Sequence, residues 1–428
     1  MLVMFRAKNY MSFKDEVILD MRATSYVQHP SHVIPVEGTK GLLKTIAVYG
    51  PNASGKSNLI SAMYFFWHYI VSQLLSAKRS ILTDTAFEKI RAMNKHDPFM
   101  LSKDINNASE FEIIFIRNGE QVQYGFECTE EEVLNEWLFI NDKKVFERDK
   151  KITIGKNYQK TIGMHTKCPK ERLYTAILDF TLEDSNVKES VLGNFMRFIL
   201  AEFKVFDEIF VDITAKTGWR SETFIDPREI VADNELREKV EKYLRAVDVG
   251  IKGFAVETVS ELNGKTGNIE EKEIILTIHN VYDSDGNIAG EKNFPLGKES
   301  SGTIGFLMYI PHIVKIIENG GVFICDEMAA RLHPLLFKFI VDIFASNENK
   351  KAQLIFTTHD ISLLNNNQFR RDEVVFIEKN ERGESNLFSL SDLKAREDAS
   401  FSKDYLQGKY GAIPVINYKD IWGGEDDA

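Results

Sequence analysis

The stretch GPNASGKS, residues 50–57, fits the pattern G-x-x-x-x-G-K-[ST] and decides the fold of the chain. It follows the β-branched, apolar run 44–49 and precedes a helical pattern that starts at residue 57, which predicts a strand, a tight loop and a helix in that order. Gly50 and Gly55 permit a close backbone approach that a Cβ atom would block, so the amides of residues 53–57 can point at phosphate oxygens. The chain is therefore predicted to bind a nucleoside triphosphate.

The side chains of this loop, called the P-loop below, extend the same prediction. Lys56 would neutralise the β- and γ-phosphates of ATP, and the Ser57 hydroxyl would bind Mg²⁺. The positive end of the following helix adds to the attraction for phosphate. We expect the remaining contacts to ATP from the neighbouring residues Asn52, Ala53, Ser54, Gly55 and Asn58.

The composition is that of an ordinary globular protein. The 428 residues are 43% hydrophobic and 27% charged, and a length near 150 residues per domain predicts two to three domains. No run reaches the roughly 18 to 20 apolar residues that span a bilayer, and the first residues lack the features of a signal peptide. We expect a cytoplasmic protein without a membrane contact. The three cysteines have no ligand spacing, which favours neither a disulfide framework nor a zinc site.

The charge of the chain disfavours indiscriminate binding to nucleic acid. A net charge of −11 opposes the phosphate neutralisation on which nonspecific binding depends. Segment 143–172 is mildly basic, but acids are interspersed in it, so a solvated surface is the favoured interpretation. DNA stays an open but disfavoured partner.

The first 150 residues are predicted to be mostly strands around one helix. Short strands are expected at 2–7 and 16–21, and the buried helix behind the P-loop covers 59–75. Asn118-Gly119 predicts a hairpin between strands 111–116 and 121–126. Asn141-Asp142 predicts a second turn within 136–146.

The remaining chain divides into a mixed middle and an α/β end. Helical periodicity covers 195–206 and 234–247, with Asn234 as the expected N-cap, and strands 254–260 and 273–280 flank Asn263-Gly264. Buried strands are expected at 322–325, 353–356 and 374–377, separated by helices. No heptad pattern persists, so no long coiled coil is expected. The expected domains are an N-terminal ATPase lobe at 1–150, a mixed α/β insertion at 151–295 and a C-terminal ATPase lobe at 296–428.

Two further groups are predicted to act on the triphosphate. Asp326 and Glu327 follow the apolar run 322–325, and the carboxyl end of a buried strand is where open α/β sheets place their ligands. Asp326 would hold Mg²⁺, and Glu327 would orient or deprotonate the attacking water. His359 follows the next apolar run and would contact the γ-phosphate.

A second anion cradle is predicted at Ser300, Ser301 and Gly302, directly before the apolar stretch 304–317. Small residues before a helix leave backbone N–H groups free to bind an anion. Two cradles about 245 residues apart are more than one triphosphate needs, as judged from the sequence positions. We therefore expect the second cradle to serve a nucleotide held by another copy of the chain.

These motifs together resemble a known family. Their order is similar to the ABC-type ATPase heads of the SMC and OLD (overcoming lysogenization defect) proteins. The two ends of the chain are similar to the small prokaryotic ATPases of abortive-infection and anti-phage loci, including the ATPase subunit of PARIS systems. The stretches that carry the resemblance are NYMSF (9–13), GPNASGKS (50–57), ESSGT (299–303), FICDE (323–327), RLHP (331–334), TTHD (357–360) and YLQGKYGAIP (405–414).

The resemblance implies an α/β ABC-ATPase head with a mixed central sheet flanked by helices, an antiparallel β subdomain and an α/β insertion. It implies a homodimer, or a higher homo-oligomer, in which two ATP molecules lie between the P-loop of one subunit and Ser301-Gly302 of the other. Lys56 and Ser57 would contact phosphate and metal, Asp326 the metal, Glu327 would be the catalytic base, and His359 would contact the γ-phosphate. Segment 331–333 would form the cross-subunit loop.

Three functions compete for this sequence. The first is an ATPase that hydrolyses ATP to ADP and phosphate and acts as the sensor of an anti-phage system, controlling a separately encoded toxin or nuclease. The second is a DNA-repair or chromosome-maintenance ATPase, and the third is a P-loop kinase, which would have no use for a second protomer's cradle. A nuclease of its own is not expected, because the residues after Asp360 are too few for the Toprim domain that follows in OLD proteins.

Overall fold

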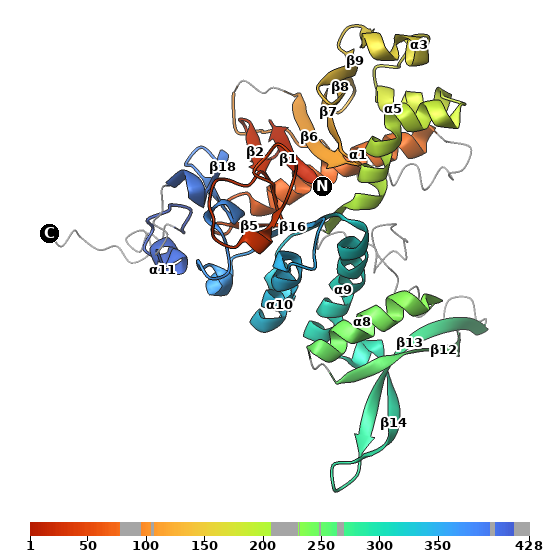
Figure 1. Cartoon of the computed structure of the whole chain (residues 1–428), viewed down its shortest axis with the longest axis vertical. Helices are drawn as coiled ribbons and strands as arrows, with labels where there is room; N and C mark the ends of the chain where they lie inside the picture. The colour runs from red at the N-terminus through yellow and green to blue at the C-terminus, as the bar shows by residue number, and fades with distance from the viewer. Residues whose placement is uncertain are drawn as a thin grey trace, which may run out of the picture.

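The computed structural model describes residues 1–77, 96–103, 107–206, 230, 232–247, 250–262, 269–393 and 399–414. Two large sheets with one long helix between them form the upper part of the molecule (Figure 1). Helices and a small three-stranded sheet form its lower part, and the loop between β13 and β14 lies at the lower tip.

A six-stranded sheet carries the P-loop. Its order is β11-β15-β16-β5-β17-β18, and every neighbouring pair is parallel except β17 with β18. All residues of β5, β15 and β16 are buried, which explains their nearly continuous apolar sequences. The predicted mixed sheet is confirmed. Its strands are β5 Thr45–Tyr49, β11 Phe203–Phe206, β15 Gly321–Cys325, β16 Ala352–Thr357, β17 Val374–Lys379 and β18 Ser385–Ser389.

A seven-stranded antiparallel sheet forms the predicted β subdomain. Its order is β10-β9-β8-β7-β6-β1-β2. Asn118 and Gly119 have φ angles of 50° and 77°, and Asn141 and Asp142 have 49° and 61°, the left-handed conformations that tight hairpin turns require. Both predicted turns are confirmed. The strands are β1 Leu2–Lys8, β2 Val17–Asp20, β6 Ser109–Arg117, β7 Glu120–Cys128, β8 Val133–Ile140, β9 Lys143–Arg148 and β10 Ile152–Ile154.

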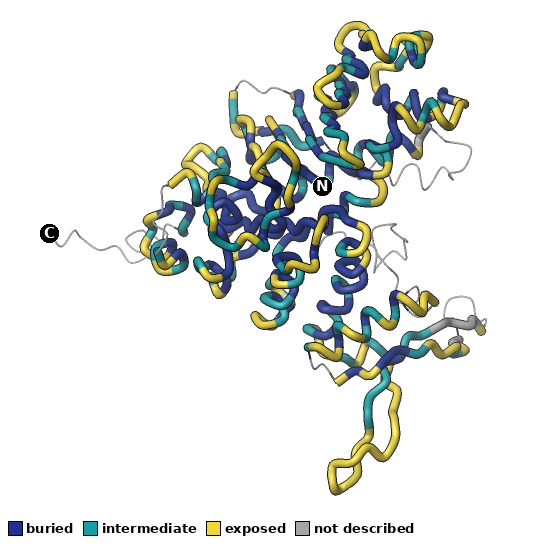
Figure 2. The backbone as a smooth tube through the Cα atoms, in the orientation of Figure 1, coloured by how far each residue is buried: buried dark blue, intermediate teal, exposed yellow. Residues whose placement is uncertain are grey.

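Helix α1, Lys56–Ala77, fills the space between the two sheets. Phe66 of α1 stacks on Phe126 of the antiparallel sheet, with 5.6 Å between the ring centroids. Its ring also meets Phe5 of the same sheet edge-on, with 5.8 Å between the centroids. Burying such aromatic faces stabilises a core by about 1.5–3 kcal/mol per side chain. The tube in Figure 2 is accordingly dark along the strands and α1. Shorter helices close this side: α3 Gln159–Ile162, α4 Tyr174–Thr181 and α5 Ser185–Arg197.

The other face of the six-stranded sheet is covered by helices α9 Ser301–Asn319, α10 Pro334–Ala345 and α11 Phe401–Leu406. Helix α8, Asn234–Ala246, packs against α9 and against β12 of a three-stranded antiparallel sheet. That sheet consists of β12 Ile251–Leu262, β13 Ile269–Tyr282 and β14 Ile288–Pro295. A small pair, β3 Val33–Ile34 with β4 Leu42–Leu43, lies before the P-loop strand.

The expected helix at 195–206 is partly wrong. Helix α5 ends at Arg197, a π-helical turn covers Phe198–Glu202, and β11 begins at Phe203. Strand β11 pairs in parallel with β15, which extends the edge of the six-stranded sheet. Phe203 and Val205 are buried there, so pairing with a distant strand outweighs the local helical pattern.

The N-cap of α8 is also corrected. Asp233, not Asn234, precedes the first helical residue, and its carboxylate accepts hydrogen bonds from the amides of Glu235 and Leu236 at 3.1 Å each. The two candidates are adjacent, and the ionised carboxylate binds the positive end of the helix better than an amide does. The strands on both sides of Asn263-Gly264 are confirmed, whereas those two residues lie outside the described ranges.

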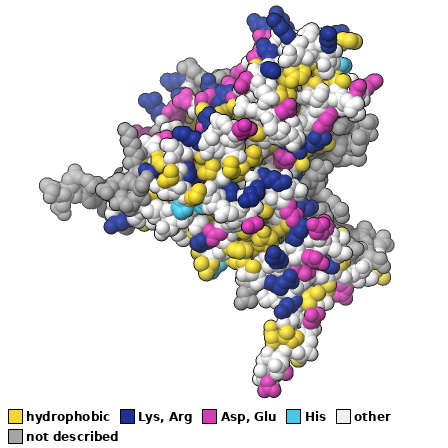
Figure 3. Space-filling model, viewed as in Figure 1, with side chains coloured by type: hydrophobic (Ala, Val, Ile, Leu, Met, Phe, Trp, Pro, Cys, Tyr) yellow, Lys and Arg dark blue, Asp and Glu magenta, His cyan; other side chains and the backbone are white. Residues whose placement is uncertain are grey.

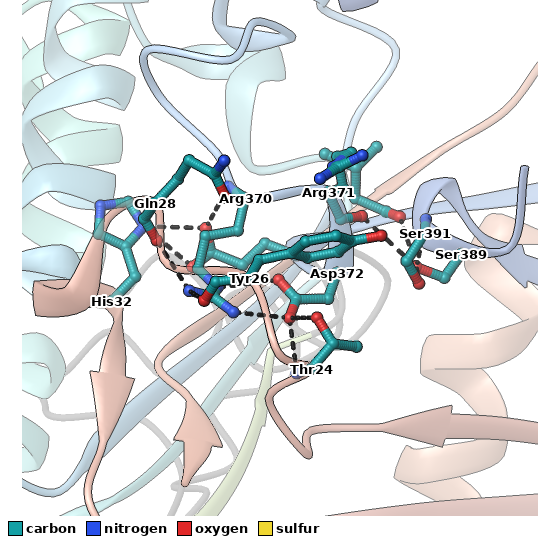
Figure 4. Close-up of polar contacts among 11 residues, drawn as sticks. Thr24, Tyr26, Gln28, His32, Arg370, Arg371, Asp372, Ser389 and Ser391 are labelled. Atoms are coloured by element: carbon teal, nitrogen blue, oxygen red, sulfur yellow. Dashed lines mark hydrogen bonds and ion pairs between the residues drawn. The ribbon is translucent and has the colours of Figure 1, made fainter. Parts of the chain in front are cut away.

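A buried polar cluster fixes the loop after β2 to the segment before β17 (Figure 4). Arg370 pairs with Asp372 at 2.9 Å and donates hydrogen bonds to the carbonyl oxygens of Tyr26 and Gln28. Asp372 also accepts hydrogen bonds from the Thr24 amide and hydroxyl. This cluster lies at the amino ends of β5 and β17, opposite the P-loop, so it holds the sheet from the far side.

Among the described residues, no helix is both long and apolar enough to cross a bilayer. The expected domain boundaries at 150 and 295 stay a prediction.

Candidate functional site

Three loops meet at one edge of the six-stranded sheet. Strands β15, β16 and β5 are neighbours and parallel, so their carboxyl ends lie side by side. The P-loop follows β5, the pair Asp326–Glu327 follows β15, and His359 follows β16. We call residues 50–57, 326–327 and 357–359 the P-loop edge. The sheet therefore brings together the groups that the sequence predicted to act on a triphosphate.

The two glycines of the P-loop are needed for its path. A Cβ atom at Gly50 would stand 2.4 Å from the Ile377 carbonyl oxygen, and Gly55 has φ +114° with the Ser385 hydroxyl 2.5 Å from the place of its Cβ. Ala53 has φ 62°, which an L residue adopts at a cost of about 1–2 kcal/mol. The loop is thus bent tightly against its neighbours and keeps its backbone amides free of side chains.

Two serines that the sequence interpretation gave no role support the P-loop from below. The Ser385 hydroxyl donates to the Ser54 carbonyl oxygen at 2.6 Å, and its oxygen lies 2.8 Å from the Ser12 hydroxyl oxygen, within hydrogen-bond distance. The Asn58 amide donates to the same Ser12 hydroxyl at 2.6 Å. Asn58, which we expected to contact ATP, uses its side chain here to hold the stretch 9–13 against the loop. Ser12 belongs to a stretch that carried the family resemblance, which was the available signal.

Lys56 is folded back onto its own loop. Its ammonium group donates to the carbonyl oxygens of Gly50 at 2.9 Å and Pro51 at 3.1 Å, and lies 3.9 Å from the Glu327 carboxylate. Burial lowers the pKa of Lys56, while the negative charges of Glu327 and Asp326 oppose this shift. Phosphate oxygens would offer this cation stronger partners than the carbonyl groups do. Ser57, Asn52 and Ala53 are exposed at the same loop.

Thr357, the last residue of β16, organises the acidic pair. Its hydroxyl donates to the Asp326 carboxylate and accepts a hydrogen bond from the Glu327 amide at 2.8 Å. The Asp326 amide donates to the Phe206 carbonyl oxygen at 3.2 Å, at the end of β11. Asp326 is therefore anchored from both sides. The sequence interpretation missed Thr357, although its place directly before Thr358 and His359 at the end of a strand was visible.

Glu327 and His359 are in direct contact. The His359 Nδ1 lies 2.9 Å from the Glu327 Oε2, and His359 is 62% exposed while Glu327 is 24% exposed. Glu327 has φ 45° and ψ 44°, a left-handed conformation that is rare for glutamate. Backbone strain of this kind is held in place by surrounding contacts, and here the Thr357 hydroxyl supplies one. The strain directs the carboxylate toward Lys56 and His359.

A cavity of about 760 Å³ lies against the P-loop. One wall is formed by the P-loop and His359, and the opposite wall by the C-terminal segment. That segment carries part of the family resemblance, but the sequence interpretation assigned no role to it. The C-terminal wall consists of Tyr405, Leu406, Ile413 and Pro414, and Lys379 and Asn380 close a third side. The Tyr405 ring packs 6.5 Å from Tyr49, the residue just before the P-loop.

The second cradle does not join this edge within one chain. Helix α9 ends two residues before β15 and packs against it, so its N-terminus points toward the carboxyl ends of the strands. Its 19 residues extend for about 28 Å, whereas the five residues of β15 extend for about 17 Å. Ser300–Gly302 therefore stand beyond the sheet, on the P-loop side but in the lower part of the molecule (Figure 1). The Ser300 hydroxyl caps α9 by accepting from the Thr303 amide at 3.1 Å.

The P-loop edge fits ATP and Mg²⁺. The Ser54 hydroxyl oxygen is buried and has no hydrogen-bond partner among the described residues, and glycine leaves a backbone cradle beside it. The described residues contain no group of three or more His, Cys, Asp or Glu side chains that could hold a metal. Mg²⁺ bound to a nucleotide takes one or two protein ligands and completes its shell with phosphates and water. Ser57 and Asp326 would be those ligands.

Comparison with known proteins adds to this geometry. The family model described as "AAA domain, putative AbiEii toxin, Type IV TA system" matches residues 46–164 and 193–365, which is more than half of the chain. An "ATP/GTP phosphatase" of Helicobacter pylori (strain ATCC 700392 / 26695) is 22% identical over 336 residues, covering 74% of this chain and 80% of that protein.

SMC heads are among the solved structures with a similar fold. The SMC head domain from Thermotoga maritima has a TM-score of 0.42 and 14% identity, covering 91% of this chain and 98% of that chain. The Smc head domain with an extended coiled coil from Pyrococcus furiosus, bound to the C-terminal domain of ScpA, has a TM-score of 0.40 and 13% identity, covering 96% and 98%.

Proposed function

Because the chain belongs to the AAA-domain family described as putative AbiEii toxin of type IV toxin–antitoxin systems and is a P-loop ATPase, we propose that it is an ATP-operated switch. Two copies would close around two ATP molecules, and hydrolysis would reopen them. The observation that carries the proposal is the separation of Ser300–Gly302 from the P-loop edge within one chain. The cradle and the P-loop edge both lie toward the carboxyl ends of the strands. A second copy related by a two-fold axis can therefore place its cradle against the P-loop edge of the first.

The residues of the P-loop edge would have different roles in binding the phosphates and Mg²⁺. The backbone amides of residues 53–57 and the Lys56 ammonium would bind the phosphates, and Ser57 with Asp326 would hold Mg²⁺, which neutralises the charge on the β- and γ-oxygens. On binding of the triphosphate, Lys56 would exchange its contacts with the Gly50 and Pro51 carbonyl groups for phosphate. The loss of the nearby cation would leave the Glu327 carboxylate free to accept a proton.

Glu327 would act as the general base and His359 would contact the γ-phosphate. A base must lie within hydrogen-bond reach of the attacking water, and the strained backbone of Glu327 directs its carboxylate over the P-loop edge. His359 is exposed enough to turn from Glu327 toward the phosphate or toward a second copy. Ser301-Gly302 of the other copy would close the site with backbone N–H groups at the N-terminus of α9.

We place this switch in abortive infection as the sensor that controls a separately encoded effector, a toxin or a nuclease. Support comes from the description of the family, which refers to a toxin–antitoxin system.

A Glu327→Gln protein in ATP and Mg²⁺ tests the switch. Without the base, hydrolysis should stop and the ATP-bound dimer should accumulate, with twice the 49.0 kDa mass of the monomer in light scattering. Glu348→Gln, at an exposed glutamate in the loop before the amino end of β16 and so at the opposite edge of the sheet from the site, is the matched control and should behave as wild type. A Glu327→Gln protein that binds ATP and stays monomeric would refute the sandwich dimer.

One observation favours the second candidate function, a DNA-binding ATPase. Exposed lysines gather over β9, β10 and α3 at the upper end of the molecule (Figure 3). They are Lys143, Lys150, Lys151, Lys156, Lys160 and Lys167, and the described ion pairs include none of them. DNA binding that increases with ATP and falls steeply with salt would favour this function over the first.

A further inference from the structure

One part of the molecule projects into solvent without packing against the other described residues of its own chain. Residues 281–293, the end of β13 with most of β14, form a two-stranded arm at the lower tip (Figures 1 and 2). Residues 288–293 are all exposed, and the arm carries Val281 at 40%, Tyr282 at 58% and Ile288 at 62% exposure. A lone two-stranded hairpin is marginally stable in water, and clustered exposed apolar residues mark interaction sites.

The base of the arm is joined to the second cradle. The Glu299 carboxylate accepts a hydrogen bond from the Thr277 hydroxyl at 2.5 Å and lies 2.8 Å from the His279 Nε2, both on β13. Glu299 directly precedes Ser300, the N-cap of α9. Any force on the arm is therefore transmitted through β13 to the residue that begins the cradle.

The order of elements across the molecule indicates what the arm would meet. In Figure 1, α11, β5, helix α9, whose first turn carries the second cradle, and the arm follow one another from the left of the molecule to its lower tip. In a two-fold pair, contacts are reciprocal. If the cradle of one copy covers the P-loop of the other, the arm beyond that cradle faces the region beyond the partner's P-loop. That region contains α11 and the cavity of about 760 Å³.

The cavity is complementary to the arm in chemistry as well. Its lining includes apolar Leu406, Ile413 and Pro414 and the cation Lys379, and it contains no acidic residue. Leu406 is 64% exposed, so this wall is not covered by the described part of its own chain. The arm offers Tyr282 and Ile288 together with the exposed acids Asp283 and Asp285 of its turn. Apolar contact and opposite charge would both favour the pair.

We propose that the arm of each copy docks on the C-terminal wall of this cavity, formed by Leu406, Ile413 and Pro414, in a second copy when ATP closes the dimer. This inference rests on the proposed sandwich dimer and adds a contact outside the nucleotide, which would lie against the opposite wall formed by the P-loop and His359. Seating of the arm would pull on Glu299 through Thr277 and His279 and so set the position of Ser300–Gly302. The arm thereby couples subunit contact to completion of the ATP site.

The test compares dimer formation by sedimentation equilibrium in ATP and Mg²⁺, with the Glu327→Gln protein as the reference. Adding Tyr282→Ser and Ile288→Ser should weaken the dimer about tenfold or more, because truncating central aromatic and apolar contacts removes most interface energy. Binding of ATP to the monomer should not change. Met164→Ser, at a 94% exposed apolar residue of the upper end, is the matched control and should leave the dimer intact.

The reciprocal surface gives a second measurement. Leu406→Ser should weaken the dimer like the arm variant, and combining the two should add little, since both remove one contact. Dimers that form equally well with and without the arm substitutions would overturn the arm contact and leave the sandwich intact. A Glu327→Gln reference that never dimerises would overturn both.

Discussion

The P-loop edge and the arm are opposite solutions to the placing of functional residues. Every group of the P-loop edge follows a fully buried strand, and the three strands are hydrogen-bonded neighbours. The arm with the second cradle follows exposed strands and has few contacts with the body of the chain. A single chain therefore supplies all the residues of the P-loop edge, whereas the exposed apolar side chains of the arm need a second surface to be buried. Preorganised chemistry is built on rigid elements, and reversible contact is built on an exposed one.

The largest expected effect is at the P-loop edge. Lys56→Ala should lower the turnover of ATP about 100- to 1000-fold, because one positioned donor to developing charge contributes about 2.7–4 kcal/mol. The folded state should lose little stability, since burial already disfavours the Lys56 charge. Turnover and nucleotide binding would be measured together with thermal unfolding. Lys338→Ala, at a half-exposed lysine of α10, is the control, and equal losses in both variants would contradict the assigned role.

Thr357→Val should have the next largest effect. Valine keeps the shape of the side chain but removes the hydroxyl that holds Asp326 and the Glu327 amide. Loss of a partner that orients a ligand costs about 10- to 100-fold in activity or metal affinity, so the Mg²⁺ concentration for half-maximal turnover should rise. Thr358→Val removes only a bond to the Asp360 amide and should change this concentration less. Identical Mg²⁺ dependence in both variants would remove Thr357 from the site.

A smaller effect is expected where the arm meets the cradle. Thr277→Val removes one hydrogen bond to the Glu299 carboxylate, worth about 1.5–3 kcal/mol to a charged group before compensation by His279. If His279 makes up for part of this loss, about 1 kcal/mol of net destabilisation remains, and ATP-driven dimerisation should weaken about threefold to tenfold. Binding of ATP by the monomer should stay the same. Thr258→Val, on the exposed part of β12, serves as control. A loss of monomer binding instead would mean that the tether acts on the fold and not on the cradle.

The smallest effect separates stability from turnover. Lys44, at the amino end of β5 far from the P-loop, has a pKa lowered to about 8 by burial. Between pH 8 and pH 10.5 the unfolded chain binds more protons at this lysine than the folded chain does, so the contribution of Lys44 to stability should rise with pH in that window. Buried thiols and phenols with raised pKa values, such as Cys128 and Tyr49, act in the opposite sense in both proteins, so the quantity to follow is the difference in the free energy of urea unfolding between wild type and Lys44→Met. That difference should move in favour of wild type as the pH rises, and a constant difference would contradict the role of Lys44.

Much of the P-loop edge was predictable because its groups stand at fixed distances from strong local signals. A buried apolar run predicts a strand, and the acid pair or histidine that follows it marks the carboxyl end of that strand. The hairpins at Asn118-Gly119 and Asn141-Asp142 were predictable for the same reason, since few residues tolerate a positive φ angle. The roles of the individual site residues still await the substitutions above.

The errors arose where distant contacts outweigh local pattern. Residues 203–206 continue a helical pattern of apolar residues in the sequence, yet they form strand β11 and pair with β15. The edge of a parallel sheet offers their backbone groups hydrogen bonds that a helix end does not. Ser385 gave no signal of its function in sequence, and Ser12 and Thr357 gave only their places in stretches that carry the family resemblance. Their hydroxyl groups matter because segments from three parts of the chain place them beneath the loop and beside Asp326.

The sequence by itself determined that this chain has a P-loop, an acidic pair and a histidine at strand ends, together with a second cradle before a helix. Local chemistry suffices for these, because each needs only a few neighbouring residues. Only the tertiary structure decided that strand order unites the first three and leaves the cradle beyond the sheet, joined to an exposed arm. The physical reason is that strand neighbours are chosen by burial of the whole core, which no short stretch of sequence contains.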